Sequence, residues 1–387
     1  MTEKLTLVQE QVRKFLAAEL LPIVDQINED GIFPEKVYRN FFKAGFGASF
    51  LPEEWGGDGD ILGYLDIGAE IGRIDLGFAL SVMASAVLFG KNVHLLGTDA
   101  QKKQYLPGIV DGSKIGCWAL TDPTTGGSDA VGIQTFCEKK GGQYILNGAK
   151  TFITNAPVAD YFIIISRMKG TEGKGIEGGC AFVVERGAAG MTLGKPLKKM
   201  GHRTSPTGEI FLENCAVPAS ALLGTEGRAF LDMKKSLDFE RAAFSAIGIG
   251  AIDELLNIMI KYAAMRNVFG KPILEYQLIQ EKIAQIGAEF DVMKAYTQVV
   301  RDKMVKGERM TKEAAIVKLL LSKLGLKAAD EAIQILGGYG YMTEYRVERI
   351  YRDMRLYEIG GGTSEIQKLV IAKELAKEYM NRPGALI

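Results

Sequence analysis

The period of the hydrophobic pattern changes twice along this chain, and the two changes limit the folds open to it. In the first part, apolar residues recur at helical spacing, as between Leu5 and Leu20. From Gly116 to about Leu223 short β-rich runs alternate with glycine turns, and after Gly227 the helical period returns. The pattern predicts an α+β chain with three domains: an N-terminal α-helical domain (1–115), a middle β-sandwich or barrel domain (116–223) and a C-terminal four-helix bundle (224–387).

Individual elements can be placed within these domains. Ala79–Leu96 is apolar enough for a buried helix. The pair Asn147-Gly148 favours a tight turn, so we expect a β-hairpin there. Three long amphipathic stretches follow the β-rich region and predict the helices of the bundle: Leu231–Met265, Ile273–Lys306 and Lys312–Leu336.

The balanced charge of the chain removes several classes of partner. Lys plus Arg and Asp plus Glu number 47 each among 387 residues, so no nucleic acid partner is expected. No run of 18 apolar residues occurs, so we expect no membrane span. The first residues lack the apolar stretch of a signal peptide and include acidic residues, which favours a cytoplasmic protein.

The residue types present do not favour metal or disulfide chemistry. The chain has two histidines, His94 and His202, which are too few for a histidine-rich metal site. Its four cysteines are widely spaced and form no CxxC pair: Cys117, Cys137, Cys180 and Cys215. We therefore predict no metal site and a reduced setting without disulfides.

The strongest functional signal is a set of glycine-rich and polar segments in a fixed order. They are Trp118–Asp129, Lys150–Ala156, Met265–Gln277, Gln334–Gly340 and Leu356–Gln367. Together, over residues from roughly 5 to 380, they resemble the acyl-CoA dehydrogenase family of flavoenzymes. The resemblance implies the family fold named above, a non-covalent FAD, and an acyl-CoA as substrate.

The resemblance also implies which residues hold FAD. Phe152 would cover one face of the flavin and Thr154 would bond its redox-active edge, because alternation puts both on one strand face. Two departures from the family pattern stand out: the loop around Thr124–Gly127 is one residue longer, and Val268 replaces a polar phosphate contact. The implied cofactor residues are Trp118, Leu120, Thr121, Ser128, Phe152, Thr154, Arg266, Phe269, Gln277, Gln334, Gly337, Gly338, Thr363 and Glu365.

The catalytic base is not where many family members have it. The family's frequent glutamate two residues before Thr363 is Gly361 here, which keeps a backbone N–H for the thioester oxygen but cannot accept a proton. Glu240, directly before Arg241, matches the position used by the isovaleryl-CoA and long-chain branch. We therefore expect Glu240 as the base and Gly361 as the oxyanion donor. Asp122 and Glu358 are weaker candidates, and Glu240 as a solvated helix-face carboxylate is the alternative reading.

Four residues are implied as substrate contacts: Ser128, Asp238, Arg241 and Gly362. Asp238 and Arg241 lie at i and i+3 on one helix face, so a structural salt bridge is an alternative or additional role. The charged cluster Arg352, Asp353 and Arg355 fits a surface or interface salt-bridge network better than a binding site.

The resemblance implies that the chain oxidises an acyl-CoA to the 2,3-enoyl-CoA and passes electrons to an electron-transfer flavoprotein. A homotetramer, built as a dimer of dimers, is implied because family cofactor sites are shared between subunits. Two alternatives remain. In the first, the same fold acts on an alicyclic or otherwise unusual acyl-CoA, or reduces an enoyl-CoA. In the second, the chain is a non-catalytic flavoprotein. The acyl pocket is expected around Ala79–Leu96 and Phe244, and the acyl group is left open.

Overall fold

The structure is a computed structural model that describes residues 6–130 and 132–382, so Leu5, where the first helical pattern begins, lies outside it. The chain divides into two compact units. The first unit contains the residues up to Tyr64 together with Gly77–Glu240. The second contains Leu65–Leu76 and the chain from Arg241 onward.

Helices open the chain, and polar caps begin the first and the last of them. They are α1 (Leu7–Glu19), α2 (Val24–Asp30), α3 (Glu35–Lys43), η1 (Glu53–Trp55), α4 (Ile61–Gly72), α5 (Leu76–Met83), η2 (Ala84–Lys91), α6 (Asn92–Leu96) and α7 (Asp99–Val110). Most of α4, from Leu65 onward, falls in the second unit. Thr6 and Thr98 each form a capping box with a glutamine three residues later. The segment η2 is a π-helix, so the expected Ala79–Leu96 helix has a widened middle.

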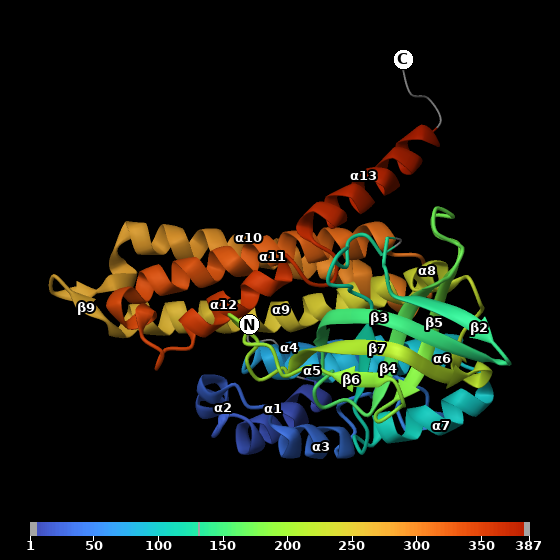
Figure 1. Ribbon diagram of the computed structural model, residues 1–387. Coiled ribbons are helices and arrows are strands. Elements are labelled where there is room, and N and C mark those ends of the chain that lie inside the picture. Colours follow the sequence, from blue (N-terminus) through green and yellow to red (C-terminus); the bar gives the residue numbers. More distant parts are fainter. Residues whose placement is uncertain (1–5, 131, 383–387) are drawn as a thin grey trace. The chain divides into compact units, whose positions relative to one another are not determined.

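Within the described residues, eight strands of the first unit form one connected sheet. Their order is β6-β7-β3-β2-β4-β5-β8, and β1 pairs with β4 (Figure 1). The strands are β1 (Gly116–Ala119), β2 (Phe136–Lys140), β3 (Gln143–Thr154), β4 (Tyr161–Met168), β5 (Gly179–Glu185), β6 (Met191–Leu193), β7 (Thr207–Pro218) and β8 (Leu222–Leu223). The helix α8 (Ala229–Asp232) follows, after the short helix η3 (Ala219–Ala221).

The hairpin expected at Asn147-Gly148 was wrong. Strand β3 runs straight through this pair, and its register against β7 shifts between Leu146 and Gly148. Gly148 has a φ of 137°, and a Cβ there would lie 2.7 Å from Thr135 Cα. The turn between β2 and β3 is made by Gly141 and Gly142 instead, both at positive φ. Asn-Gly therefore marks a bulge with close backbone approach, which uses the same glycine freedom as a turn.

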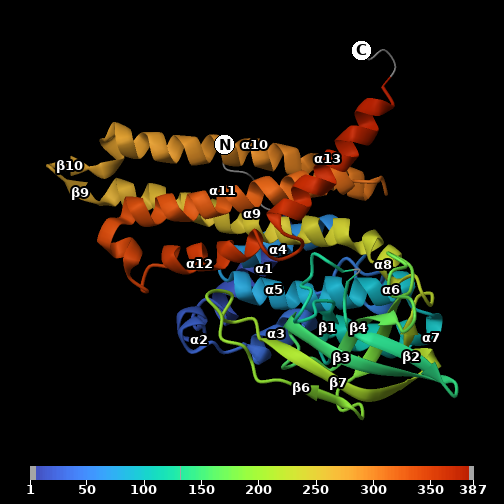
Figure 2. The same cartoon turned by 45° about the horizontal axis from the view of Figure 1, so that its top comes forward.

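The second unit is built from long helices. They are the continuation of α9 (Lys234–Met265), α10 (Gln277–Val305), α11 (Thr311–Leu336), α12 (Val347–Tyr357) and α13 (Ser364–Met380), with η5 (Gly337–Tyr341) after α11. Figure 2 shows α10 and α11 side by side, and a small hairpin of β9 (Asn267–Val268) and β10 (Lys271–Pro272) joins α9 to η4 (Ile273–Glu275) and α10. The three long stretches predicted from the sequence are therefore helical.

Glycines allow α4 and α9 to approach closely in the second unit. A Cβ added at Gly72 would lie 2.0 Å from the Ile247 carbonyl oxygen, and one at Gly250 would lie 1.8 Å from the Ala69 carbonyl oxygen. Backbone contact of this kind needs residues without side chains.

Two helical stretches are long and apolar enough to cross a membrane, which the sequence expectation had not allowed for. They are Leu76–Leu96 and Ser236–Met265, and their most apolar windows are 89% and 61% buried within the protein. Burial inside a folded chain identifies both as core helices, because a span would present its side chains to lipid.

Candidate active site

The end of β3 presents an aromatic side chain in an unusual backbone conformation. Phe152 has a φ of 58° and is 70% exposed, although it is a large apolar residue. The pairing register between β3 and β7 shifts between Lys150 and Ile153, so the strand bulges at this point. Thr151 and Ile153 are buried, while Phe152 and Thr154 are the more exposed positions. An exposed ring held at a strained φ is a feature of binding sites rather than of strand interiors.

A buried ion pair joins this strand to the preceding loop. Lys150 is fully buried, and its Nζ donates to an Asp122 carboxylate oxygen and to the Leu120 carbonyl at 2.8 Å. The same carboxylate accepts from the Gln134 and Thr135 amides at 2.6 and 2.7 Å. Burial lowers the pKa of the Lys150 ammonium to about 8, and the Asp122 carboxylate opposes that shift. Asp122 therefore accepts hydrogen bonds within the fold, a role that the sequence reasoning did not predict when it proposed this residue as a candidate base.

The loop that the pair supports carries the first implied cofactor residues. Trp118 lies on β1 and is half-buried, and Thr121 accepts from the Thr151 amide at 2.9 Å through its carbonyl oxygen. Leu120 is half-buried, and Ser128 is exposed. The contact between Thr121 and Thr151 brings the two implied flavin segments of the first unit together.

The first turns of α9 carry the proposed base and substrate contacts. Glu240 and Asp238 are half-buried, and Arg241 is buried with 7% exposure. Phe239 packs on Phe50 with ring centroids 5.0 Å apart, and Lys91 Nζ lies 4.1 Å from the Phe239 centroid. Burial lowers the pKa of Lys91 to about 8. The sequence reasoning missed Lys91 because it belongs to an apolar helix that otherwise carries no chemical motif.

In the second unit, a hollow of about 570 Å³ collects several of the implied cofactor residues. Arg266, Gly337 and Gly338 line it, and the Arg266 guanidinium lies 5.7 Å from the Tyr339 ring centroid. The remaining lining is mostly apolar: Tyr262, Val268, Ile273, Ile279, Ile335, Leu336 and Met342. Such a hollow, with one cation and bare glycine backbone, suits an anionic group attached to a flat apolar one.

Three other implied cofactor residues lie near this hollow in the chain without lining it. Gln334 is exposed on the last turn of α11, and Gln277 is exposed at the start of α10. Phe269 is 94% exposed at a φ of 50°, at the turn of the β9–β10 hairpin.

The glycine-rich signature forms the loop before α13. Gly361 and Gly362 have φ values of 63° and 82°, and the Thr363 hydroxyl caps α13 by accepting from the Ile366 amide at 3.3 Å. Among the described residues, no acceptor bonds the amides of Gly361, Gly362 or Thr363. Glu365 is exposed, and its pKa is lowered by a hydrogen bond from its own backbone amide and, to a lesser extent, by one from the Thr363 side chain. The loop therefore offers three free amide donors and no carboxylate at position 361.

The neighbouring charged residues have structural partners. Arg352 pairs with Glu348 at 2.7 Å, Arg355 pairs with Glu358, and Asp353 is buried. The Phe244 ring stacks on Tyr357 with centroids 3.9 Å apart. Glu358 is therefore engaged in an ion pair, which weakens it as a base. Over the described ranges 6–130 and 132–382, no group of three metal-binding side chains is found.

Family models match the chain in three consecutive parts. They are the acyl-CoA dehydrogenase N-terminal domain (residues 2–113), middle domain (117–215) and C-terminal domain (227–376). The helical, β-sheet and helical parts of the structure have the same order, which confirms the fold class predicted from the sequence.

Individual relatives agree over nearly the full length. A 3-(aryl)acrylate reductase of Clostridium sporogenes is 36% identical, over 97% of this chain and 99% of its own. A mitochondrial isovaleryl-CoA dehydrogenase of Arabidopsis thaliana is 36% identical, over 96% of this chain and 90% of its own. The structure of butyryl-CoA dehydrogenase from Megasphaera elsdenii superposes with a TM-score of 0.92 at 34% identity, covering 97% of this chain and 100% of that one.

The chain belongs to the acyl-CoA dehydrogenase family. It is therefore an oxidoreductase of a soluble, acyl-CoA-binding flavoprotein family, and this family implies FAD as cofactor. Its relatives carry the names of dehydrogenases and of reductases, so the family includes both directions of the reaction.

Proposed function

We propose that this chain is an FAD-dependent acyl-CoA dehydrogenase that uses Glu240 as its base. The observation that carries the proposal is the signature loop, which has three free amides and no side chain at Gly361. A carboxylate is available at Glu240, half-buried on α9 directly before Arg241. A glutamate at position 240 with none at position 361 is the combination that the resemblance to the isovaleryl-CoA and long-chain branch implies. A relative named isovaleryl-CoA dehydrogenase is 36% identical to this chain.

The residues present fit FAD. Phe152 offers an exposed ring, and Thr154, two residues further along β3, offers a half-buried hydroxyl. Arg266 supplies a guanidinium for a phosphate, over a hollow whose floor includes Gly337 and Gly338. The further proposed FAD contacts are Trp118, Leu120, Thr121, Ser128, Phe269, Gln277, Gln334, Thr363 and Glu365. Bound FAD would accept the two electrons that leave the β-carbon of the substrate.

The protein's own part in the chemistry is to move one proton and to bind one oxygen. A proton alpha to a thioester is too weakly acidic for a carboxylate in water, so the thioester oxygen needs donors where negative charge develops. The Gly361 amide is the proposed donor. Glu240 then takes the α-proton as general base. Asp238, Arg241, Ser128 and Gly362 are the proposed contacts to the CoA part.

The family also suggests the setting in which the enzyme works. We propose a homotetramer arranged as a dimer of dimers, a cytoplasmic location, and an electron-transfer flavoprotein as electron acceptor. A structure described with an electron-transferring flavoprotein of Acidaminococcus fermentans matches this chain with 32% identity. We further propose domain limits of 1–115, 116–223 and 224–387, which the three matched family ranges support.

The test of the base is Glu240→Gln, measured as the rate of flavin bleaching by acyl-CoA under anaerobic conditions. Glutamine keeps the shape but cannot take the proton, so the rate should fall on the order of 10²–10⁴-fold with acyl-CoA binding nearly unchanged. The matched control is Glu254→Gln on the same helix, where Glu254 pairs with Arg346 at 3.4 Å. A Glu240→Gln protein that bleaches at the wild-type rate would refute the assignment.

A second candidate function is reduction of an enoyl-CoA, favoured by the similarity to the 3-(aryl)acrylate reductase. The same groups would serve, because Glu240 would return a proton to the α-carbon. A panel of straight, branched, alicyclic and aromatic acyl-CoAs, and of the matching enoyl-CoAs, would separate the two directions. Preference is read from kcat/KM with an artificial acceptor or donor.

A further inference from the structure

A buried lysine of α11 touches the signature loop. Lys318 is 1% exposed, and its Nζ donates to the Gly362 carbonyl oxygen at 2.6 Å across 44 residues of sequence. Burying an ammonium group is costly unless it is hydrogen-bonded. The contact therefore ties the loop to the interior of the second unit with a charged donor, where an apolar side chain would have filled the space.

A buried amide holds the loop from α13. Gln367 has no exposed surface, and its Nε2 donates to the Gly361 carbonyl at 3.1 Å and to the Gly362 carbonyl at 3.0 Å. A Cβ at Gly362 would lie 2.8 Å from this nitrogen, so the Gln367 side chain would have to shift, and the φ of 82° itself favours glycine. Two side chains from two helices thus bind the two carbonyl oxygens.

The direction of the free amides follows from these bonds. In a trans peptide the C=O and N–H point in opposite directions. With the carbonyls of Gly361 and Gly362 held by Gln367 and Lys318, the amides of Gly362 and Thr363 point away from both side chains. Upstream, the Gly360 amide bonds the Leu356 carbonyl at 2.7 Å. The peptide group between Gly360 and Gly361, which carries the Gly361 amide, therefore lies between two anchored peptide groups, although Gly361 has no side chain of its own to fix it.

We propose that Lys318 and Gln367 are positioning residues that aim the amide donors of the Gly361–Thr363 loop at the thioester oxygen. The inference rests on the proposed function, in which the Gly361 amide binds that oxygen. Donors that are already oriented before the reaction need no rearrangement when charge develops. Neither side chain touches the substrate in this proposal. Their effect passes through the backbone that they hold.

The experiment uses the FAD-loaded protein and the variants Lys318→Met and Gln367→Leu, which remove the donors. The probe is 3-oxobutyryl-CoA, whose bound enolate is followed by ultraviolet absorbance as pH is varied. We expect the pKa of the bound probe to rise by about one unit or more, and kcat to fall on the order of 10–100-fold, since losing one such donor outright costs about 10²–10³. The Kd of the probe's neutral form should stay within about twofold of wild type.

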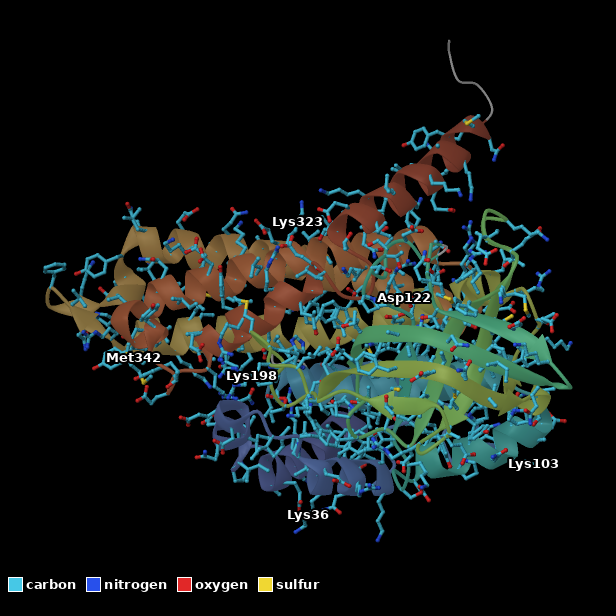
Figure 3. The ribbon with its side chains drawn as sticks, in the orientation of Figure 1. Lys36, Lys103, Asp122, Lys198, Lys323 and Met342 are labelled. Atoms are coloured by element: carbon cyan, nitrogen blue, oxygen red, sulfur yellow. The ribbon has the colours of Figure 1, made fainter. Side chains whose placement is uncertain are left out.

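The control is Lys323→Met, an exposed lysine on the same helix that Figure 3 labels. It should leave the probe's pKa and kcat unchanged. An unchanged probe pKa in either folded variant would overturn the proposal, as would failure of both variants to fold with FAD, since the contacts would then serve folding alone. A wild-type protein that neither ionises the probe nor reacts with any acyl-CoA would refute the proposed function itself.

Discussion

Three lysine side chains make contacts within the fold, and each contacts a different kind of partner. Lys150 pairs with Asp122 in the loop that follows β1, Lys318 bonds the Gly362 carbonyl, and Lys91 lies over the Phe239 ring. A buried charge without a partner is strongly destabilising, so the buried Lys150 and Lys318 need these contacts to remain charged.

Replacing Lys150 by Met should destabilise the protein by about 3–5 kcal/mol, because it leaves the Asp122 carboxylate buried without its cation. Unfolding in urea, followed by circular dichroism, measures the change. The exposed Lys140, which pairs with Glu138 at 3.1 Å, provides the control, and Lys140→Met should leave the midpoint unchanged. Equal midpoints for the two variants would show that the buried pair contributes nothing.

His202 should make stability fall in acid. It is buried with 1% exposure, and burial lowers its pKa to about 3 from an ordinary value of 6.5. Between those pH values the unfolded chain binds a proton that the folded chain does not. Stability is therefore lost as pH falls below 6.5, by up to about 1.4 kcal/mol per pH unit.

The variant His202→Asn isolates this contribution, because asparagine does not titrate and tolerates the φ of 48° at this position. Between about pH 4 and pH 6, the free energy of unfolding of this variant should change with pH less steeply than that of the wild type. The difference in slope should correspond to one bound proton. An identical slope in both proteins would assign the acid sensitivity to other groups.

At the scale of elements, glycines decide where segments can meet. Gly148 lets β3 pass close to Thr135, and Gly250 lets α9 touch the backbone of α4. The sequence motif Asn147-Gly148 indicated special backbone geometry correctly and its type wrongly. A bulge and a hairpin use the same conformational freedom, and pairing with β7, more than 60 residues away, selected the bulge.

Gly250→Ala should destabilise the second unit by about 1–3 kcal/mol or more, since the new methyl group would collide with the Ala69 carbonyl. Gly287→Ala on α10 is the matched control, because a Cβ there meets nothing within 4 Å. That change should raise stability by roughly 0.5–1 kcal/mol through helix propensity. Thermal unfolding of both variants tests whether the two substitutions change stability in opposite directions. A Gly250→Ala protein as stable as the wild type would contradict the close contact.

For the whole molecule, the prediction is assembly into four copies. Phe269 is 94% exposed at the turn of the β9–β10 hairpin, and burying its ring against a partner would remove apolar surface from water. We expect the FAD-loaded protein to sediment at four times the chain mass of 42.2 kDa. A stable FAD-loaded monomer would contradict this.

Phe269→Asn tests the ring separately from the backbone, because asparagine tolerates the φ of 50°. The variant should assemble more weakly and lose FAD on dilution. Ile176→Asn, at an exposed position of the first unit, is the control and should do neither.

Much of the fold could be predicted from the sequence, because hydrophobic period is a local property. The alternation of helical and β-rich stretches, the long helices from Lys234 to Leu336 and the order of the three parts all follow from neighbours in the chain. The motif residues were found for the same reason, since identity and spacing can be seen without a fold. The family comparisons agree with this fold and leave the base and the acyl group to experiment.

Other properties exist only through contacts between residues far apart in the sequence. Lys318 and Gly362 are separated by 44 residues, and Lys150 and Asp122 by 28. Neither pair can therefore be recognised from the sequence around its members. The change of Asp122 from candidate base to buried acceptor has the same origin. The sequence by itself determined the elements, the family and the groups available for chemistry. The tertiary structure decided which of those groups are buried, because burial and hydrogen bonding depend on partners that folding alone brings together.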